Sequence, residues 1–372
     1  MRVIEREVIL SRWHVYHSKL DSFSSVTKKM YFAKYIRGNY LYFSSAEKKE
    51  DLENNFEKIK FYGKELPPIH PGTNDQSTET PEDIDIPQME LEHELEIKKY
   101  DTITLQKDEY GNEQLQKLSM YELYVEFYKE NTNLIYFNTG YDVNQLLKEV
   151  EKIHDLLREL KLVNVDSKVP IVVEDPFFYT GTSLSDESLI TAFYGDVVEE
   201  GLSWVTDVEN FRIKIEEDPK MFKPLILFDH DGLRTKRKVV AYQDKIHPLY
   251  DVYNAFKYNK NPTGNGFYLD TASPTGIGYT YVSVEAENTI KLEELDKVVW
   301  GMYFKGWHTC NWNEGRISVK LDNGILYENG TPIGIVNSGS LEINLPEYVQ
   351  KAISVDKEVS RMGIKYKPFV IF

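Results

Sequence analysis

The sequence has little of what a disulfide-stapled, membrane-spanning or secreted protein needs. Its only cysteine, Cys310, has no partner for an intramolecular disulfide and cannot build a cysteine-based zinc site. No stretch approaches the roughly 18 to 20 consecutive apolar residues that span a bilayer. The first ten residues, MRVIEREVIL, carry charges where a secretory signal is apolar. These absences predict a soluble protein that is made in the cytoplasm, does not insert into membranes and holds together by packing alone.

Common catalytic motifs are missing as well. The chain has no Gly-x-Ser-x-Gly, no phosphate-binding loop and no Gly-x-Gly-x-x-Gly before a helix. Its eight histidines include no His-x-His or His-Glu-x-x-His spacing. We therefore expect no cofactor and no metal, and favour a protein that is not an enzyme. The formal net charge of −16 argues against broad nucleic-acid binding, which needs a large positive face.

Length and composition predict the fold class. A chain of 372 residues exceeds one hydrophobic core, so we expect about two or three domains. The 26 tyrosines and 18 phenylalanines favour strands. We predict an α+β fold with an N-terminal mixed α/β portion and a β-rich C-terminal module of sandwich or jelly-roll type. The expected divisions are a hairpin and helix (1–63), an acidic, proline-rich linker or loop (64–88), strands plus a long amphipathic helix (89–165) and the β-rich module (166–372).

Turn residues support the meander expected in the C-terminal module. Asp322-Asn323-Gly324 and Asn329-Gly330 each separate short alternating runs of apolar residues. Such pairs readily take the positive φ angles of tight hairpin turns. We predict a turn at each site.

A row of glutamates alternates with apolar residues in MELEHELEI, residues 89–97. Alternation of period two predicts a strand with the carboxylates on one face. An edge or surface strand that charge keeps from sticking to other strands explains the row. Docking on a basic surface explains it too, either on a partner protein or on the basic arm of a neighbouring copy. The row is Glu90, Glu92, Glu94 and Glu96, and the arm is Arg234, Lys236, Arg237 and Lys238.

The clearest helix is predicted after Asp142, a good N-cap residue. Its apolar positions step by four and three residues, as in about two heptads. The stripe fits a helix that packs on the core of its own domain, and it also fits a seam for oligomerisation. The positions are Leu146, Val150, Ile153, Leu157 and Leu160.

Four aromatic residues lie close together in WGMYFKGWHTCNW. Alternating rings on a β-module can form a platform for a sugar or a hot spot for a partner, and they can equally be core. The candidates for glycan or partner binding are Trp300, Tyr303, Trp307 and Trp312.

The stretch PLILFDHDGL resembles the start of the nucleophile loop in haloacid-dehalogenase-like phosphatases. The resemblance implies that Asp229 attacks phosphorus and that Asp231 handles the leaving-group proton near Mg²⁺. It covers six residues and then departs from the family, because Leu233 and Arg234 follow where that family has Thr or Val. A hairpin turn explains the same Asp and Gly residues.

Three functions follow from these patterns. The first is a non-enzymatic structural or adaptor protein of a larger assembly, such as a bacteriophage virion, which works through protein partners in a homo- or hetero-oligomer. The second is a glycan- or receptor-binding protein that uses the aromatic platform. The third is a metal-dependent phosphohydrolase with Asp229 and Asp231.

Overall fold

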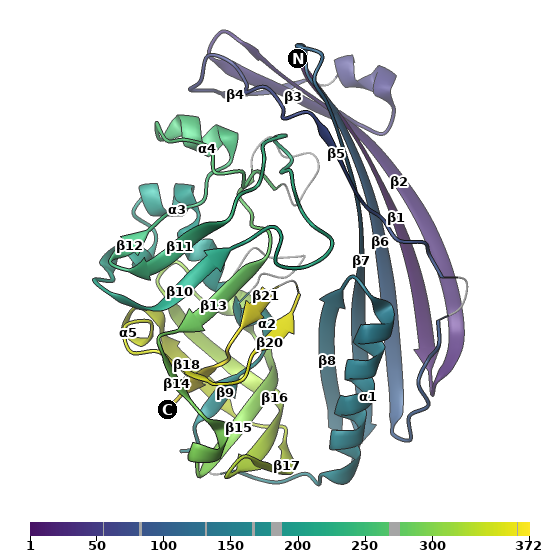
Figure 1. Cartoon of the computed structure of the whole chain (residues 1–372), viewed down its shortest axis with the longest axis vertical. Coiled ribbons are helices and arrows are strands. Elements are labelled where there is room, and N and C mark those ends of the chain that lie inside the picture. The colour runs from purple at the N-terminus through teal and green to yellow at the C-terminus, as the bar shows by residue number, and fades with distance from the viewer. Residues whose placement is uncertain are drawn as a thin grey trace.

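The first part of the chain folds into one long sheet, and burial alternates between its two faces most clearly along residues 92–100. The computed structural model describes residues 1–54, 56–81, 84–130, 132–165, 168–179, 188–267, 276–362 and 364–372. The sheet stands as a tall curved wall beside the rest of the chain (Figure 1). Its strands, in the order in which they lie side by side, are β4 (Glu57–Lys60), β3 (Tyr40–Ala46), β2 (Lys19–Arg37), β1 (Arg2–Tyr16), β6 (Glu92–Lys107), β7 (Glu113–Lys129) and β5 (Gly72–Gln76), and β8 (Thr132–Gly140) also pairs with β7.

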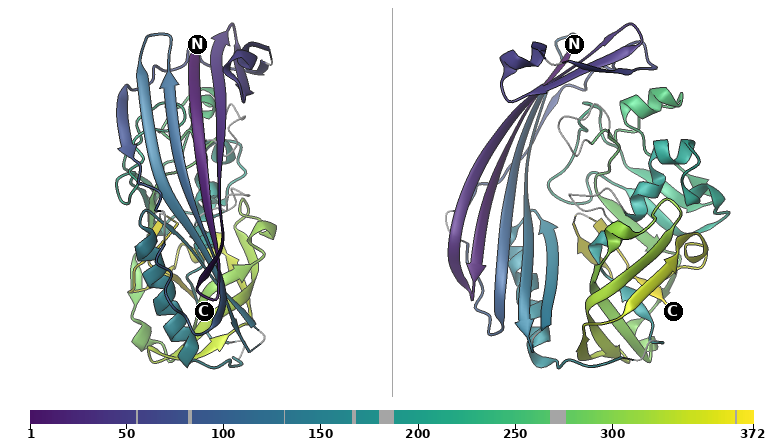
Figure 2. Two further views of the ribbon diagram at one scale, coloured as in Figure 1. Left: turned by 90° about the vertical axis from the view of Figure 1, so that its right-hand side faces the viewer. Right: turned by 180° about the vertical axis from the view of Figure 1, so that it is seen from behind.

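The central strands of this wall pair over their whole length. From Glu92 opposite Tyr128 to Lys107 opposite Glu113, β6 and β7 keep one register. Gly111 takes a φ of 82° in the connecting turn, a conformation that glycine adopts without steric cost. The remainder of the chain lies along the concave side of the wall, as the side and rear views show (Figure 2).

The predicted amphipathic helix is confirmed as α1 (Val143–Glu159), and it packs on β7 and β8. The side chain of Asp142 caps it by accepting a hydrogen bond of 2.9 Å from the backbone N–H of Asn144. Its apolar stripe joins a core with Trp13, Leu95 and Phe127 of the sheet. The oligomer seam is therefore a wrong prediction, because Leu146, Val150, Leu157 and Leu160 are buried in this core and Ile153 is partly buried against it.

The predicted division of the N-terminal half (residues 1–165) differs from the sheet that forms. Strands from 1–63 and from 89–165 share one sheet. The expected linker 64–88 contributes β5, in which Gly72 pairs in parallel with Gln114 of β7, while residues 82–83 lie outside the described residues. The helix expected before residue 63 is only the 3₁₀ turn η1 (Lys49–Asn54), followed by β4.

The C-terminal half (residues 168–372) contains two mixed sheets, so the predicted β-rich character is confirmed. The first runs β12 (Lys245–Ile246), β11 (Lys238–Gln243), β10 (Phe211–Glu217), β13 (Val282–Ala286), β21 (Ile364–Tyr366) and β20 (Val359–Arg361). The second runs β14 (Asn288–Ile290), β19 (Ile353–Val355), β22 (Phe369–Ile371), β9 (Ile171–Val173), β15 (Lys297–Lys305), β16 (Arg316–Glu328) and β17 (Thr331–Val336), with β18 (Ser340–Asn344) also on β16.

Parallel pairs show that the jelly-roll expectation is wrong. Jelly rolls are antiparallel throughout, whereas β13 pairs in parallel with β21, β14 with β19 and β9 with β15. The two sheets share a large apolar core. Short helical segments connect the strands: α2 (Pro176–Tyr179), η2 (Leu189–Phe193), α3 (Gly195–Glu199), η3 (Trp204–Asp207), α4 (Val252–Lys257), η4 (Leu292–Glu294), η5 (Trp307–Thr309) and α5 (Leu345–Tyr348).

A membrane-spanning helix needs a long apolar run. Within the described ranges, no helix is both long and apolar enough to cross a bilayer.

Candidate functional site

A cavity of about 310 Å³ lies where α1 and β8 face the C-terminal half. We call it the interface cavity. One side is lined by β8, by the start of α1 and by Met120 of β7, and the other by Phe222, Lys223, Tyr281 and Ser360. Ligand sites commonly have this size and commonly form between two packed units. The interface cavity is therefore our candidate functional site.

Glu149 on α1 supplies a half-buried carboxylate to the cavity. Its Oε2 accepts a hydrogen bond of 3.0 Å from the Tyr136 hydroxyl and one of 2.8 Å from the Asn138 side-chain amide. Helix and strand thus hold this side chain in one orientation. Asn138 also links the two halves, because its Oδ1 accepts a hydrogen bond of 3.3 Å from the backbone N–H of Met362.

The opposite wall of the cavity is aromatic and carries one cation. The Phe222 and Tyr281 rings meet edge to face, with centroids 5.7 Å apart. The Lys223 Nζ lies 5.7 Å from the centroid of the Tyr141 ring, across the boundary between the two halves. Such contacts between an ammonium and an aromatic face are attractive. The wall can therefore pack an apolar group and meet a negative charge near its rim.

A buried ion pair supports the floor behind Asn138. The Arg361 guanidinium pairs with Glu174 and lies 4.1 Å from the centroid of the Tyr136 ring. The Trp300 indole N–H also donates to Glu174. Burial disfavours the charged form of Glu174, but Arg361, the Trp300 hydrogen bond and Lys357 together hold the pKa of Glu174 below its usual value. Removing either partner would leave a buried charge alone, so the pair fixes this part of the interface.

A second polar contact between the halves is the carboxylate cluster, which comprises Asp229, Asp231 and Asp251. Its cations come from the wall: Lys34 Nζ lies 3.7 Å from Asp231 Oδ1, and Arg2 donates to the Asp231 carbonyl. All three carboxylates also accept backbone N–H groups, from Leu233 and Gly266 to Asp229, from Val252 to Asp231, and from Asn254 and Gly276 to Asp251.

Burial changes the titration of this cluster. It raises the pKa of Asp229 to about 8 and that of Asp251 to about 6, and the neighbouring Asp231 carboxylate adds to both increases. Burial also lowers the pKa of Lys34 to about 8, although Asp231 opposes that change. Perturbed groups often mark active sites, but they also occur in structural ion-pair networks. Here each of the three carboxylates accepts hydrogen bonds from backbone N–H groups. The cluster is therefore a structural contact between the wall and the C-terminal half.

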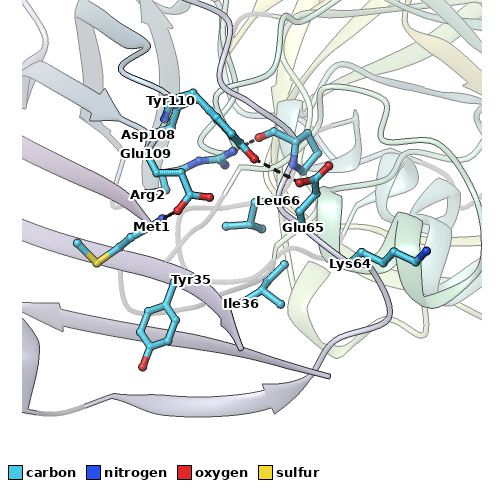
Figure 3. Close-up of a pocket in the computed structure, with 11 residues that line it drawn as sticks. Met1, Arg2, Tyr35, Ile36, Lys64, Glu65, Leu66, Asp108, Glu109 and Tyr110 are labelled. Carbon is cyan, nitrogen blue, oxygen red and sulfur yellow. Dashed lines mark hydrogen bonds and ion pairs between the residues drawn. The ribbon is translucent and has the colours of Figure 1, made fainter. Parts of the chain in front are cut away.

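Arg2, which contacts this cluster, also lines a pocket of about 150 Å³ (Figure 3). The Arg2 guanidinium donates both to the carbonyl of Asp231 in the cluster and to the carbonyl of Pro67, which lines the pocket. Across the pocket, the Tyr110 hydroxyl donates to Glu65 at 3.2 Å. These donors are satisfied within the chain, which makes the pocket a weaker candidate than the interface cavity.

The predicted phosphohydrolase site is wrong. Asp229 and Asp231 do adjoin a turn, with an isolated antiparallel bridge between Phe228 and Arg234. Both carboxylates are buried beneath the wall, however, and line none of the cavities described above. A phosphate could not reach them without separating the two halves.

The predicted aromatic platform is also wrong for the three tryptophans. Trp300, Trp307 and Trp312 are all at most 5% exposed. Trp307 and Trp312 stack with centroids 5.9 Å apart inside the C-terminal core. Tyr303 is half-buried. Buried rings cannot offer a face to a sugar.

Glu92, Glu94 and Glu96 of the glutamate row lie on β6, as the alternation predicts, whereas Glu90 lies just before the strand. β6 is not an edge strand, because it lies between β1 and β7. His93, Leu95 and Ile97 are fully buried on the other face. All four carboxylates have partners within the chain: Arg158 for Glu90, Tyr16 and His17 for Glu92, Tyr128 for Glu94, and Arg12 and Lys98 for Glu96.

The basic arm is not brought to the glutamate row within one chain. Arg237 pairs with Glu216, and Lys238 lies 3.2 Å from Glu217. Arg234 and Lys236 are exposed. Docking between the row and the arm of another copy stays a prediction.

Sequence reasoning missed the residues that line the interface cavity. Asn138 and Glu149 follow the strand–helix connection, whereas Lys223 and Tyr281 come from distant segments. No local motif joins them. The one available signal was Glu149 on the apolar side of the predicted helix, between Leu146 and Val150.

Comparison with known proteins identifies the family. Residues 167–372, more than half of the chain, match the model of the PmbA/TldA metallopeptidase C-terminal domain. The chain belongs to the PmbA/TldA metallopeptidase family. This overturns the expected bacteriophage structural or adaptor protein, and with it the glycan-binding and phosphohydrolase alternatives.

Similar proteins extend this result to the whole fold. TldE from Thermococcus kodakarensis superimposes with a TM-score of 0.72 at 17% identity, over 99% of this chain and 94% of that one. A protein from Thermotoga maritima described as a candidate modulator of a DNA gyrase gives 0.69 at 14% identity, over 100% and 94%. An uncharacterized protein of Methanocaldococcus jannaschii is 30% identical over 145 residues, which are 39% of this chain. The match spans only 34%, about a third, of that relative's length.

Membership in a metallopeptidase family implies a metal ion, but the donor groups do not fit one. Across the described ranges, no group of three or more His, Cys, Asp or Glu side chains is placed to hold a metal. Two buried histidines near α1 are already engaged: His93 Nε2 accepts the N–H of Ser18 at 3.0 Å, and His154 Nε2 accepts that of Glu90 at 3.0 Å. Because each of these nitrogens already accepts a backbone N–H, it cannot also coordinate a metal.

Proposed function

We propose that this chain acts in peptide hydrolysis as the peptide-binding member of a metallopeptidase assembly. The family match over residues 167–372 supports the link to peptide hydrolysis. The likeness to TldE over 99% of the chain supports an intact family fold. The observation that carries the proposal is the interface cavity, because it combines a carboxylate, a cation and aromatic walls at the boundary between the two halves.

A second chain would supply the catalytic metal in this proposal. The described residues offer no metal-ligand set, and peptide hydrolysis by a metallopeptidase requires one to activate water. The chain would then bind and orient the peptide, while the partner carries the reacting centre. A homo- or hetero-oligomer is thus part of the proposed function.

Strand β2 offers a surface for such a partner. The strand β3 pairs only with Tyr31–Arg37 of β2, so within the described part of the chain no strand pairs with the outer edge of residues 19–30. Leu20, Phe23 and Val26 on this segment are each more than half exposed. An open, partly apolar edge readily pairs with a strand of another chain.

The proposal is tested by measuring metal content and peptidase activity together. The purified chain is dialysed, its zinc, manganese and iron are measured by mass spectrometry, and a fluorogenic peptide series is assayed with and without added Zn²⁺. We expect substoichiometric metal and no hydrolysis by the chain alone. Hydrolysis should appear when a zinc-binding member of the same family from the same genome is co-purified with it.

Two results would contradict this assignment. Stoichiometric metal and hydrolysis by the isolated chain would place the reacting centre on this chain itself. The second result would be that the zinc-binding member hydrolyses peptides equally well without this chain and that this chain binds no peptide. The chain would then have no part in the reaction.

A further inference from the structure

Only one of the two oxygens of the Glu149 carboxylate accepts hydrogen bonds from the described residues. Both of its hydrogen bonds, from Tyr136 and Asn138, go to Oε2. No hydrogen bond or ion pair within the described part of the chain reaches Oε1. This oxygen is not among the buried polar atoms that lack a partner, so it is open to a donor from outside the chain.

The other charged groups of the interface cavity do not satisfy Glu149. The Asp142 side chain serves as the N-cap of α1. The single cation of the lining, Lys223, lies against the Tyr141 ring and makes no ion pair with Glu149. The cavity therefore has a negative site on the side formed by α1 and a positive site on the side formed by the C-terminal half.

The aromatic rings on one side of the cavity limit which kinds of ligand it can bind. Phe222 and Tyr281 make one side of the cavity apolar, and their ring faces attract a cation. A small divalent metal ion is disfavoured, because one free carboxylate oxygen and an amide cannot complete its coordination. A primary ammonium fits better, since it has three N–H donors and is carried on an organic group that can pack against the rings.

We propose that the interface cavity binds the α-amino terminus of a peptide, with Glu149 Oε1 as its counter-charge. The proposal rests on the proposed function and names the part of the peptide that the cavity holds. The Tyr136 and Asn138 hydrogen bonds keep the carboxylate in place before the ligand arrives. The rest of the peptide then passes Phe222 and Tyr281 towards Lys223. Capture of a peptide amine by a preorganised acceptor is a known mode of recognition.

The test compares free and N-acetylated tripeptides of the series Ala-Xaa-Ala by calorimetry on the full chain. Acetylation removes the positive charge and two of the three donors. We expect acetylation to weaken binding about 10- to 100-fold, as expected for loss of a charged hydrogen bond. N-acetyl-Ala-Lys-Ala distinguishes an α-amino group from a lysine side chain and should bind as weakly as the other acetylated peptides.

Glu149→Gln provides the matched variant, because glutamine has the same shape and its oxygen still accepts from Tyr136 and Asn138. This variant should bind the free peptides more weakly by the same factor. Acetylation of the peptide should not weaken its binding to the variant any further. Glu151→Gln, at an exposed position of the same helix, should bind as the natural chain does. Equal melting temperatures of the variants show that folding is intact.

The outcomes separate this inference from the function on which it rests. Equal binding of free and acetylated tripeptides would overturn the amine site and leave peptide binding standing. Selective binding of N-acetyl-Ala-Lys-Ala over the other acetylated peptides would reassign the site to a lysine side chain. Binding of none of the peptides would contradict the proposed function itself.

Discussion

Asn323 in the C-terminal half is paired with the backbone of Ile135 in the wall, 188 residues earlier. Its Oδ1 accepts the Ile135 N–H at 3.2 Å, and its Nδ2 donates to the Ile135 carbonyl at 3.2 Å. The side chain of Asn323 thus makes the two backbone hydrogen bonds that a neighbouring strand would make to Ile135 of β8. A register shift in β15 opposite Asn323 accompanies this arrangement. One amide therefore joins the two large sheets of the protein.

Asn323→Ala should lower the free energy of unfolding by about 1 to 3 kcal/mol, because the Ile135 N–H and C=O would stay buried without partners. Urea unfolding followed by circular dichroism measures the change. Asn337→Ala is the control, since that side chain makes one exposed hydrogen bond to Thr132. It should change stability by less than about 0.5 kcal/mol. Equal effects of the two variants would show that the pairing contributes nothing.

Gly232→Ala should destabilise the protein more than Gly111→Ala. Both glycines have positive φ, which costs another residue about 1 to 2 kcal/mol. A Cβ at Gly111 meets open space, whereas one at Gly232 would lie 2.4 Å from Cγ2 of Ile69, in the connection between β4 and β5. The overlap should add about 1 to 3 kcal/mol, measured as the difference between the two urea unfolding midpoints. If both variants lose the same stability, Gly232 does not pack against Ile69 as closely as described.

Local pattern predicted some of the elements but not their neighbours. Alternation placed Leu95 and Ile97 on a buried face, and the structure agrees. It could not show that β6 lies between β1 and β7, because those strands come from distant parts of the chain. The stripe on α1 likewise predicted a packed face, yet an apolar face has the same pattern whether a sheet or another helix covers it.

Turn residues and clustered aromatic residues likewise did not show which parts of the chain would be neighbours. Asn329-Gly330 forms the predicted turn, with φ of 48° and 77°. Asp322-Asn323-Gly324 does not, because β16 continues through it and Asn323 finds a partner in β8. The clustered tryptophans pack against one another in the core, where composition cannot reveal their exposure. The candidate site could not be predicted, since Glu149, Lys223 and Tyr281 come together only after the halves pack.

The carboxylate cluster predicts how stability depends on pH. Asp229 has a pKa of about 8 in the folded protein and about 3.9 in an unfolded chain. Between these values the folded protein holds a proton that the unfolded chain has released. The free energy of unfolding should therefore fall as pH rises from about 5 to about 8, by at most about 1.4 kcal/mol per pH unit for this proton.

Asp229→Asn should flatten that slope between pH 6 and pH 8, because an amide does not titrate. Asp251, with a pKa of about 6, accounts for part of the slope below this window. Urea unfolding at pH 5, 6, 7 and 8 measures both proteins, and Asp207→Asn at an exposed position is the matched control. The same slope in Asp229→Asn and in the natural chain would refute the assignment of the proton to Asp229.

Leu157→Ala should show that the apolar stripe on α1 stabilises the core of its own chain. The side chain is 3% exposed and lies in the core that α1 shares with the wall, so its truncation leaves a cavity there. We expect a loss of about 2 to 5 kcal/mol in the free energy of unfolding. The molecular mass in solution, measured by light scattering, should stay unchanged, because the residue faces its own sheet. Lys152→Ala on the exposed side of α1 is the control and should alter neither quantity. A drop in mass with little loss of stability would instead assign the stripe to an interface between chains.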